Sequence, residues 1–329
     1  MAESKMRHLT ITSALNTALR EEMRRDESVI VMGEDIGVYG GVYGVTLGLQ
    51  REFGPERVRD TPISEMAIAG MALGGALGGL RPVAEIMYCD FLAHASDAIV
   101  NNAAKWRYMS GGQYTLPLVV RSPAGGGGGT AAQHSQSLEA WFTHVPGLKV
   151  VMPSVPRDAR GLLKAAIRDD NPVVFIEHKH HYMYKGEVPA DEEVIAIGVA
   201  DVKREGTDLT VVSWSRHLTL CLEAAETLAS EGISLEVVDP RTLQPLDIAT
   251  ICQSVAKTGR LAVVHEAVLF GGFGGEIVAQ VVQECWGDLK QPPLRIGAPF
   301  CPIPYSEPME SFVIPQASAI AERLKAYVA

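Results

Sequence analysis

Residues 60–88 read DTPISEMAIAGMALGGALGGLRPVAEIMY, and this stretch indicates how the chain folds. Glu65 opens a run in which every residue from Met66 to Leu80 is apolar or glycine, a pattern that predicts a helix over 65–79. The β-rich run Val83–Tyr88 follows almost at once. A helix that leads into a short apolar strand is the repeating unit of an α/β protein.

The same alternation extends along the chain on both sides of this stretch. The expected strands cover residues 29–32, 83–88, 116–121, 149–152 and 173–177, and the expected helices cover residues 10–25, 65–79, 92–109, 136–142 and 156–168. We therefore expect a mainly parallel sheet with helices on both faces.

Residues 186–206 break this rhythm with Pro189, several acids and Gly206, and are predicted to form a meander and a linker. A second α/β series follows, with strands at 209–214, 234–238, 261–265 and 294–297 and helices at 217–230, 246–256, 275–286 and 316–328. A length of 329 residues suggests about two domains. We predict one domain over residues 1–200 and another over 201–329.

The composition argues against several classes of protein. Hydrophobic residues make up 47% of the chain and charged residues 21%, as in a globular protein with a large core. The net charge is −10 and no block of Lys and Arg stands out, so we expect no nucleic-acid or membrane partner. The start lacks the apolar stretch of a signal peptide, so we expect none, and residues 66–80 are too short for a membrane span of roughly 20 residues. Five cysteines without a Cys-x-x-Cys fit a reducing cytoplasm and argue against a zinc site or a disulfide frame.

Glu65 is the first candidate for a functional residue. Thr61 is expected to cap a helix whose first turn holds Pro62, so that Glu65 lies early in this helix. The helix dipole favours an anion there, which alone is a sufficient structural reason for the acid. Alternatively, partial dehydration against the apolar run tunes the acid for proton chemistry. Glycines recur at four-residue spacing along the helix and favour a close contact with another helix, either of this chain or of a second subunit.

The second candidate is the glycine run Gly125–Gly129 with His134 shortly after it. The run follows a strand that ends at Arg121, and α/β sheets bind their ligands at the ends of parallel strands. A histidine there can act as an acid, a base or a donor near neutral pH. The alternative is a mobile loop with a surface histidine. The glycines match neither a Walker motif nor a dinucleotide-binding fingerprint.

Short motifs along the whole chain occur in a recognisable order. They are Gly33-Glu-Asp35, Gly40-Gly-Val-Tyr43, Asp60-Thr-Pro-Ile-Ser-Glu65, Gly79-Leu-Arg-Pro-Val83, Asp90-Phe91, Tyr108-Met-Ser-Gly-Gly112, Gln133-His134-Ser135, Pro146-Gly-Leu-Lys-Val-Val151, Ala166-Ile-Arg-Asp-Asp-Asn-Pro172 and Asp239-Pro-Arg-Thr-Leu243. This ordered set resembles the β subunit of a thiamine-diphosphate-dependent 2-oxo acid dehydrogenase E1 component. The resemblance implies an α/β fold with an N-terminal pyrimidine-binding domain and a transketolase-type C-terminal domain.

The resemblance gives Glu65 a partner. Glu65 stands where the glutamate of this family hydrogen-bonds N1′ of the aminopyrimidine ring of thiamine diphosphate. Phe91 matches the aromatic residue that packs on this ring, and Ile63 and Met87 match apolar residues of the same pocket. His94 is a departure near the cofactor, because some relatives carry Gln there, and it bears on substrate choice.

The resemblance also assigns roles to the loop and to a later turn. His134 matches the histidine implicated in reductive acylation of the lipoyl group, as a proton donor or a positioning group. The oxygen-rich turn 167–172, which by itself predicts only a turn, matches part of a structural potassium site built chiefly from backbone carbonyls. The matching positions are Leu118, Ala166, Ile167, Asp169 and Asn171.

One part of the family's active site is missing from this chain. Thiamine-diphosphate enzymes hold the diphosphate through Mg²⁺ with a Gly-Asp-Gly motif, and this sequence contains none. The family supplies the motif from a separate α subunit in an α₂β₂ heterotetramer. The gap argues against a complete transketolase, in which the diphosphate domain lies upstream in the same chain.

The resemblance implies a cytoplasmic oxidoreductase subunit that works with an E1 α subunit and an E2 lipoyl acyltransferase. We expect a pyruvate dehydrogenase (acetyl-transferring) E1 β subunit. The alternatives are an acetoin dehydrogenase β subunit, which Glu177-His-Lys179 and Gly186-Glu-Val-Pro189 favour somewhat, and a branched-chain 2-oxo acid dehydrogenase β subunit. A non-catalytic paralogue that keeps the fold is the competing class, and the presence of Glu65, Phe91 and His134 argues against it.

Overall fold

The computed structural model describes residues 6–329 and divides into two compact units. The first unit comprises the residues up to Ala124 together with Trp141–Ile197, and the second comprises Gly125–Ala140 together with Gly198–Ala329. Residues 1–5, part of the N-terminus considered above for a signal peptide, lie outside the described residues. Within residues 6–329, no helix combines the length and the apolar character that crossing a membrane requires.

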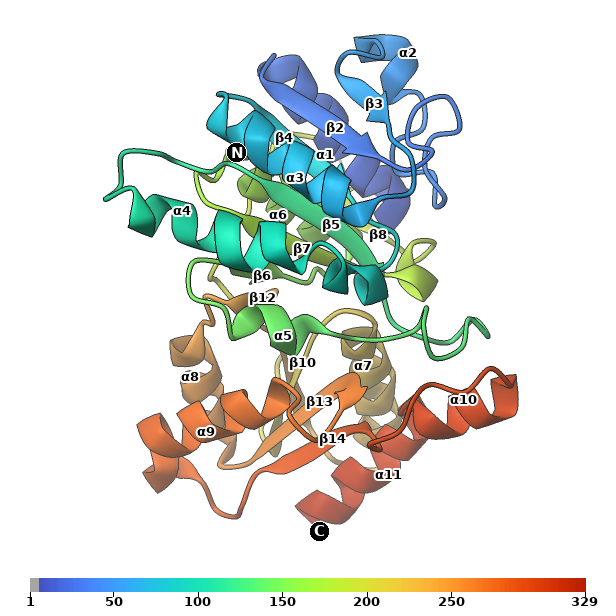
Figure 1. The fold of residues 1–329 in the computed structure, drawn as a ribbon. Helices are drawn as coiled ribbons and strands as arrows, with labels where there is room; N and C mark the ends of the chain where they lie inside the picture. Colours follow the sequence, from blue (N-terminus) through green and yellow to red (C-terminus); the bar gives the residue numbers. More distant parts are fainter. Residues whose placement is uncertain (1–5) are drawn as a thin grey trace. The chain divides into compact units, whose positions relative to one another are not determined.

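The first unit is built on a parallel sheet with strand order β6-β7-β5-β4-β2-β3, as predicted from the alternation of strands and helices. Figure 1 shows α3 and α4 on one face of this sheet and α1 and α6 on the other. The elements are β1 (Met6–Thr10), α1 (Ile11–Arg25), β2 (Val29–Gly33), α2 (Leu49–Phe53), β3 (Val58–Asp60), α3 (Glu65–Leu77), β4 (Arg81–Glu85), α4 (Ala104–Met109), β5 (Val119–Ala124), α5 (Glu139–Thr143), β6 (Lys149–Val151), α6 (Pro156–Arg168), β7 (Val173–His178) and β8 (Lys185–Pro189). The chain returns from the second unit to the first within α5.

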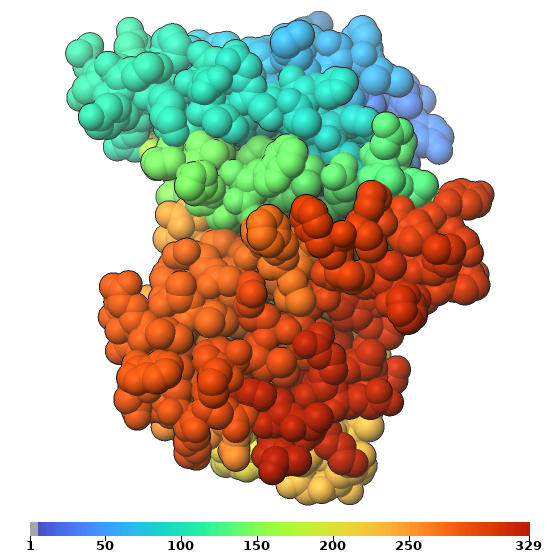
Figure 2. Space-filling view, turned by 60° about the horizontal axis from the view of Figure 1, so that its bottom comes forward, coloured from blue at the N-terminus to red at the C-terminus, as the bar shows by residue number. Residues whose placement is uncertain are grey.

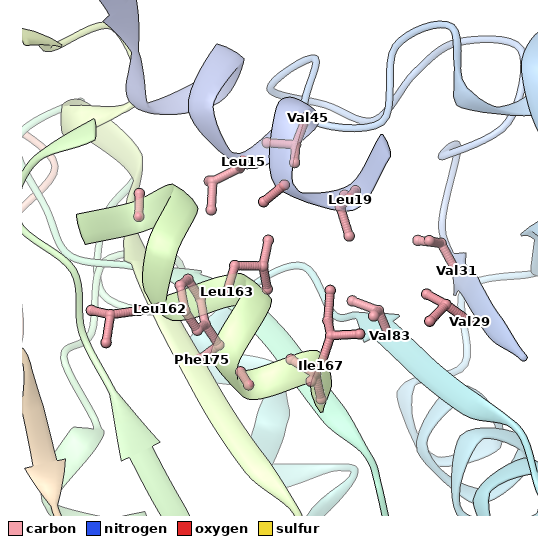
Figure 3. Close-up of a cluster of buried hydrophobic side chains, with 14 of the residues drawn as sticks. Leu15, Leu19, Val29, Val31, Val45, Val83, Leu162, Leu163, Ile167 and Phe175 are labelled. Carbon is pink, nitrogen blue, oxygen red and sulfur yellow. The ribbon is translucent and has the colours of Figure 1, made fainter. Parts of the chain in front are cut away.

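A hydrophobic core lies between this sheet and the helices α1 and α6 (Figure 3). Each helix starts with a residue suited to that place. The Thr10 side chain caps α1 by accepting a hydrogen bond from the Ser13 amide, and Pro156 begins α6, where its missing N–H is harmless. Burial of one large aliphatic side chain contributes roughly 1.5–3 kcal/mol. The labelled members of the core are Leu15, Leu19, Val29, Val31, Val45, Val83, Leu162, Leu163, Ile167 and Phe175.

The helix that opens with Glu65 was predicted in the right place but with the wrong cap. Ser64, not Thr61, precedes the first helical residue, and Pro62 lies outside the helix. The Thr61 amide donates instead to the carbonyl of Gly33 at the end of β2. Glu65 is therefore the first residue of α3, where the free amides and the dipole of the helix favour its negative charge most strongly.

Three other predicted elements need correction. The single helix expected over 92–109 is a 3₁₀ turn, Cys89–Ala93, then a π-helical segment, Asp97–Ala103, and only then α4. The strand expected from residue 116 begins at Val119, because Pro117 offers no N–H to a sheet. The expected meander 186–206 contains β8, which pairs antiparallel with β1, and a strand of the second unit.

The second unit contains a five-stranded sheet with order β14-β13-β10-β11-β9, parallel except for β9. Its elements are β9 (Asp201–Arg204), β10 (Leu209–Ser213), α7 (Arg216–Ala229), β11 (Leu235–Asp239), β12 (Thr242–Gln244), α8 (Ile248–Thr258), β13 (Leu261–Val268), α9 (Gly274–Cys285), β14 (Leu294–Ala298), α10 (Glu307–Val313) and α11 (Ala317–Val328). In Figure 1, α8 and α9 lie beside each other. On the face drawn in Figure 2, orange and red residues, which include α9, β14, α10 and α11, form most of the surface of this unit.

Candidate functional site

The first candidate site lies in the first unit, at the start of α3. The Glu65 residue is only 9% exposed, although it begins a helix and carries a charged group. The Nδ1 atom of His94 lies 3.7 Å from Glu65 Oε2, and the His94 side chain is 67% exposed. The carboxylate is thus largely removed from water and has a weak contact with an exposed side chain, an arrangement that leaves it available to a ligand.

Other residues expected around Glu65 present apolar and aromatic surface. The Phe91 ring meets the His94 ring edge to face, with 6.0 Å between ring centroids. Ile63 is 80% exposed although it is aliphatic, whereas Met87 is buried. The structure therefore connects Glu65, His94 and Phe91 through contacts, and an exposed aliphatic side chain lies two residues before the acid. An acid beside an aromatic ring and aliphatic surface suits a flat, nitrogen-containing ring.

Glu34 is a second acid of this region that the sequence analysis left without a role. It follows β2, and burial together with the charge of Glu65 raises the pKa of its carboxyl group. Its Oε1 atom is buried and accepts no hydrogen bond within residues 6–329. Its position directly after a parallel strand, in the motif Gly33-Glu-Asp35, was the signal that would have identified it.

His134 lies in the second unit, on the loop that precedes α5. The residue is half-buried, and the loop is held by local hydrogen bonds. The Thr130 hydroxyl donates to the carbonyl of His134 at 3.1 Å, and the same hydroxyl lies 2.8 Å from that of Ser135. Ala131 adopts a left-handed backbone with φ of 59°, which turns the chain within this segment. The main chain at His134 therefore has a defined conformation.

Two buried carboxylates anchor the glycine run before His134. The Gly126 amide donates to Glu266 Oε1 at 2.6 Å, while the Gly127 and Gly129 amides donate to Glu310 at 2.7 and 2.9 Å. Glu266 and Glu310 are both buried. These hydrogen bonds attach the glycine run to the rest of the second unit. The peptide amides of the loop donate to two carboxylates, which is a recognised way to bind negative charge.

The sequence of this loop has a geometric reason. Gly127 and Gly129 have left-handed backbone conformations, with φ of 104° and 63°, which favour glycine. A Cβ atom on Gly126 would lie 2.7 Å from Ile314 Cδ1, too close for a side chain. Glycine at these positions allows the backbone to reach Glu266 and Glu310.

A third acid, Glu139, lies close to this anchor. Burial raises the pKa of Glu139 to about 7, and the charge of Glu266 adds to the rise. The Oε2 atom of Glu139 is buried and has no hydrogen-bond partner in the described part of the chain. The second carboxylate oxygen of Glu266, Oε2, lies 3.5 Å from His217 Nδ1. Glu266, Glu310 and Glu139 were all missed by the sequence analysis.

The oxygen-rich turn after α6 carries the expected carbonyl groups. The carbonyls of Ile167 and Asp169 accept hydrogen bonds from the Arg81 guanidinium at 3.0 and 3.2 Å, and Asp169 Oδ1 accepts from the Asn171 amide at 2.9 Å. The end of a helix favours a cation through its free carbonyls and its dipole. Across residues 6–329 no group of His, Cys, Asp and Glu side chains could hold a metal ion, so a cation here would depend on carbonyl oxygens.

Comparisons with family models cover almost the whole chain. The transketolase pyrimidine-binding domain matches residues 7–185, and the transketolase C-terminal domain matches residues 198–320. The structure also resembles a chain described as a split gene transketolase in an inactive β4 tetramer, with a TM-score of 0.77 over 97% of this chain and 98% of that one. Their sequences are 23% identical, so this likeness concerns the fold alone.

Three relatives are nearly equally similar to the chain. The 2-oxoisovalerate dehydrogenase subunit beta of Bacillus subtilis is 48% identical, over 92% of this chain and 94% of the relative. The pyruvate dehydrogenase E1 component subunit beta of the same organism is 47% identical, over 96% and 98%. The acetoin:2,6-dichlorophenolindophenol oxidoreductase subunit beta of Cupriavidus necator is also 47% identical, over 96% of both chains.

Proposed function

Because the chain belongs to the family of β subunits of 2-oxo acid dehydrogenase E1 components, we propose that it is the β chain of a thiamine-diphosphate-dependent E1 enzyme. With an α subunit, this enzyme would oxidatively decarboxylate a 2-oxo acid and pass the acyl group to the lipoyl group of an E2 acyltransferase. The observation that carries the proposal is the Glu65 carboxylate, which is largely buried at a helix start and lies 3.7 Å from an exposed histidine, His94.

Glu65 would hold the cofactor ring and control its protonation. The carboxylate would accept a hydrogen bond at the pyrimidine nitrogen N1′, because low exposure strengthens such a contact relative to water. When bound, thiamine diphosphate supplies a carbon nucleophile for the carbonyl of the substrate. The protein contributes orientation and a fixed negative charge at N1′.

The apolar neighbours of Glu65 would form one wall of the pyrimidine pocket. Phe91 would pack on the ring, with Ile63 and Met87 beside it. An exposed aliphatic residue such as Ile63 would be covered when the ring binds, which favours binding through the hydrophobic effect. His94, within 3.7 Å of the acid, would lie at the substrate side and influence substrate choice.

His134 would act on the lipoyl group rather than on the decarboxylation step. A histidine can donate a proton near neutral pH, as reductive cleavage of a disulfide requires. Glu266 and Glu310 would position this residue by fixing the loop that carries it. The positioning role is supported by three amide hydrogen bonds, each to a charged acceptor.

The site would be completed by a second chain. The 329 residues contain no Gly-Asp-Gly motif, so the Mg²⁺ that holds the diphosphate would take its ligands from an α subunit. We propose that the assembly is an α₂β₂ heterotetramer. We also propose a cytoplasmic location, because five cysteines without a Cys-x-x-Cys motif fit a reducing compartment. A structural K⁺ would bind through the carbonyls at Leu118, Ala166, Ile167, Asp169 and Asn171.

The substrate we propose is pyruvate, with acetoin as the second candidate. Relatives named for 2-oxoisovalerate, pyruvate and acetoin differ by no more than one percentage point in identity, so overall similarity does not separate them. Further relatives named as pyruvate dehydrogenase β subunits support the first choice. Turnover of the three substrates by the heterotetramer would decide between them.

The proposal is tested by Glu65→Gln in the chain assembled with its α subunit. We expect 2-oxo acid turnover to fall by at least about 100-fold, the usual loss when a preorganised catalytic hydrogen bond is removed, while the assembly stays intact by light scattering. Glu56→Gln, a change at an 89% exposed side chain, is the matched control and should be silent. Near-normal turnover of the Glu65 variant would refute the proposed role.

A further inference from the structure

Two cysteines of the second unit face each other across a pair of helices. Cys252 lies on α8 and Cys285 is the last residue of α9. The Cys285 thiol donates to Cys252 Sγ at a sulfur–sulfur distance of 2.9 Å, and Cys285 Sγ lies 3.3 Å from the carbonyl oxygen of Val281. Both residues are partly exposed.

This pair is close to the geometry of a disulfide. A disulfide bond is about 2.05 Å long, so the two sulfurs need to approach by less than about 1 Å. Their residues are 33 positions apart in the chain, on neighbouring helices that are already packed together. Rotation about the side-chain bonds, without a rearrangement of the helices, can supply so small a movement.

We propose that Cys252 and Cys285 form a thiol-redox site, at which a hydroperoxide converts the two thiols into a reversible disulfide. In the first step one thiolate sulfur attacks an oxygen of the hydroperoxide. The S–O bond forms, the O–O bond breaks, and the leaving oxygen takes a proton to give water or an alcohol. In the second step the other sulfur attacks the sulfenic sulfur, the S–S bond forms, and the hydroxyl group leaves as water.

The electrons and protons of this reaction balance within the pair and the oxidant. Two thiols supply two electrons and two protons, and the hydroperoxide accepts both. Burial, followed by the hydrogen bond with Cys285, raises the pKa of the Cys252 thiol to about 12, and the charges of Glu284 and Asp288 add to the rise. The Cys252 thiol therefore keeps its proton near neutral pH until the pair meets an oxidant.

Oxidation would join α8 to α9 covalently and close a loop of 33 residues that includes β13. Closing such a loop reduces the freedom of the unfolded chain, which stabilises the folded state. The expected consequence is a second unit that is more resistant to unfolding under oxidising conditions and returns to its original stability on reduction.

The test treats the full-length chain with hydrogen peroxide and maps its cysteines by mass spectrometry. We expect one linked peptide that joins Cys252 to Cys285, with a mass two hydrogen atoms below the sum of the two reduced peptides. Dithiothreitol should reverse this link. The unfolding midpoint of the oxidised chain should rise by about 5 °C or more.

The controls use cysteine-to-serine variants that are first checked for native circular dichroism. Cys252→Ser and Cys285→Ser should each abolish the intramolecular link, whereas Cys301→Ser, a change at an exposed cysteine, should keep it. Oxidation of the exposed Cys301 in the unmodified chain shows that the oxidant has acted. Oxidation of Cys301 while Cys252 and Cys285 stay reduced would overturn the proposal. Links only between chains, or only sulfinic acids at this pair, would overturn it as well.

Discussion

The two units treat their buried carboxylates differently. In the first unit, Glu85 and Glu177 share one guanidinium, because Arg121 donates to Glu85 at 2.5 Å and to Glu177 at 2.6 and 2.7 Å. The Tyr182 hydroxyl also donates to Glu177 at 2.5 Å. In the second unit, the peptide amides of a glycine loop take the place of the guanidinium and bind Glu266 and Glu310.

The buried acids of the first unit hold the sheet together, whereas those of the second unit position a loop. A guanidinium between two acids fixes three strands to one another and is removed only at high cost. Amides balance a carboxylate while they shape the main chain that carries them. Among residues 6–329, Glu65 has neither a guanidinium nor a set of peptide amides as its partner, and this contrast identifies it as an acid held for a ligand.

The largest effect on stability is expected when the Arg121 guanidinium between Glu85 and Glu177 is removed. Arg121→Met should lower the free energy of unfolding by about 3–5 kcal/mol, because Glu85 and Glu177 would remain buried without a cation. Urea unfolding followed by circular dichroism measures the loss. Arg59→Met, which breaks an exposed pair with Glu56, is the control and should cost less than about 1 kcal/mol. Equal losses in the two variants would contradict the structural role of Arg121.

A pH effect is expected next, at Glu139 beside the amide-bound acids. Its pKa of about 7 in the folded state lies above the ordinary value of 4.5, so the folded protein keeps the proton that the unfolded chain releases. The contribution to stability is complete below about pH 4.5 and is lost as the pH rises through 7, by up to about 3 kcal/mol.

Glu139→Gln should remove this dependence, because the amide cannot ionise. The stability of the variant relative to the unmodified chain should therefore increase between pH 5 and pH 7.5, as measured by urea unfolding at both values. Glu226→Gln, at an exposed position of α7, should show no such trend. A constant difference between the Glu139 variant and the parent would show that this acid titrates normally.

A smaller effect is expected when the loop anchor is weakened. Glu310→Gln should cost roughly 1–3 kcal/mol, because an amide side chain cannot accept from both Gly127 and Gly129. In the heterotetramer, lipoyl acylation should fall more than decarboxylation followed with an artificial electron acceptor. Glu307→Gln on the same helix is the control. Equal losses in the two assays would argue against positioning of His134.

The smallest effect is expected at His94, which is exposed and contacts Glu65 only at 3.7 Å. His94→Gln should change the KM for the oxo-acid substrate by a few-fold, which corresponds to less than about 1 kcal/mol. It should leave the stability of the chain unchanged. Steady-state kinetics with pyruvate and acetoin measure the change, and a large loss of kcat would show that His94 does more than border the site.

Much of the fold was predictable because it depends on local patterns. The helix α6 was predicted with its observed bounds, since Pro156 and the apolar spacing mark it within one stretch of chain. The strands β1 and β8 were missed, because each is short and partly exposed and is specified by a distant partner, as in the pair His8 and Glu187, which are 179 residues apart.

The candidate site was predictable only in part, because contacts between distant segments leave no local pattern in the sequence. Glu65 stands out in the sequence as a lone acid before an apolar run, and the contact with His94 then follows from the fold. Glu266 and Glu310 gave no signal, because they bind glycine amides 140 and 183 residues away. Ordinary glutamates on a strand and a helix carry no local mark of such a role.

The sequence by itself determined the alternation of strands and helices and the position of Glu65 at a helix start. Local propensity, helix caps and apolar periodicity act over a few residues, and the chain displays them directly. Only the tertiary structure decided which carboxylates are buried, what balances their charge and which two cysteines meet. Those properties depend on contacts between distant segments, where desolvation sets the energy of each charge.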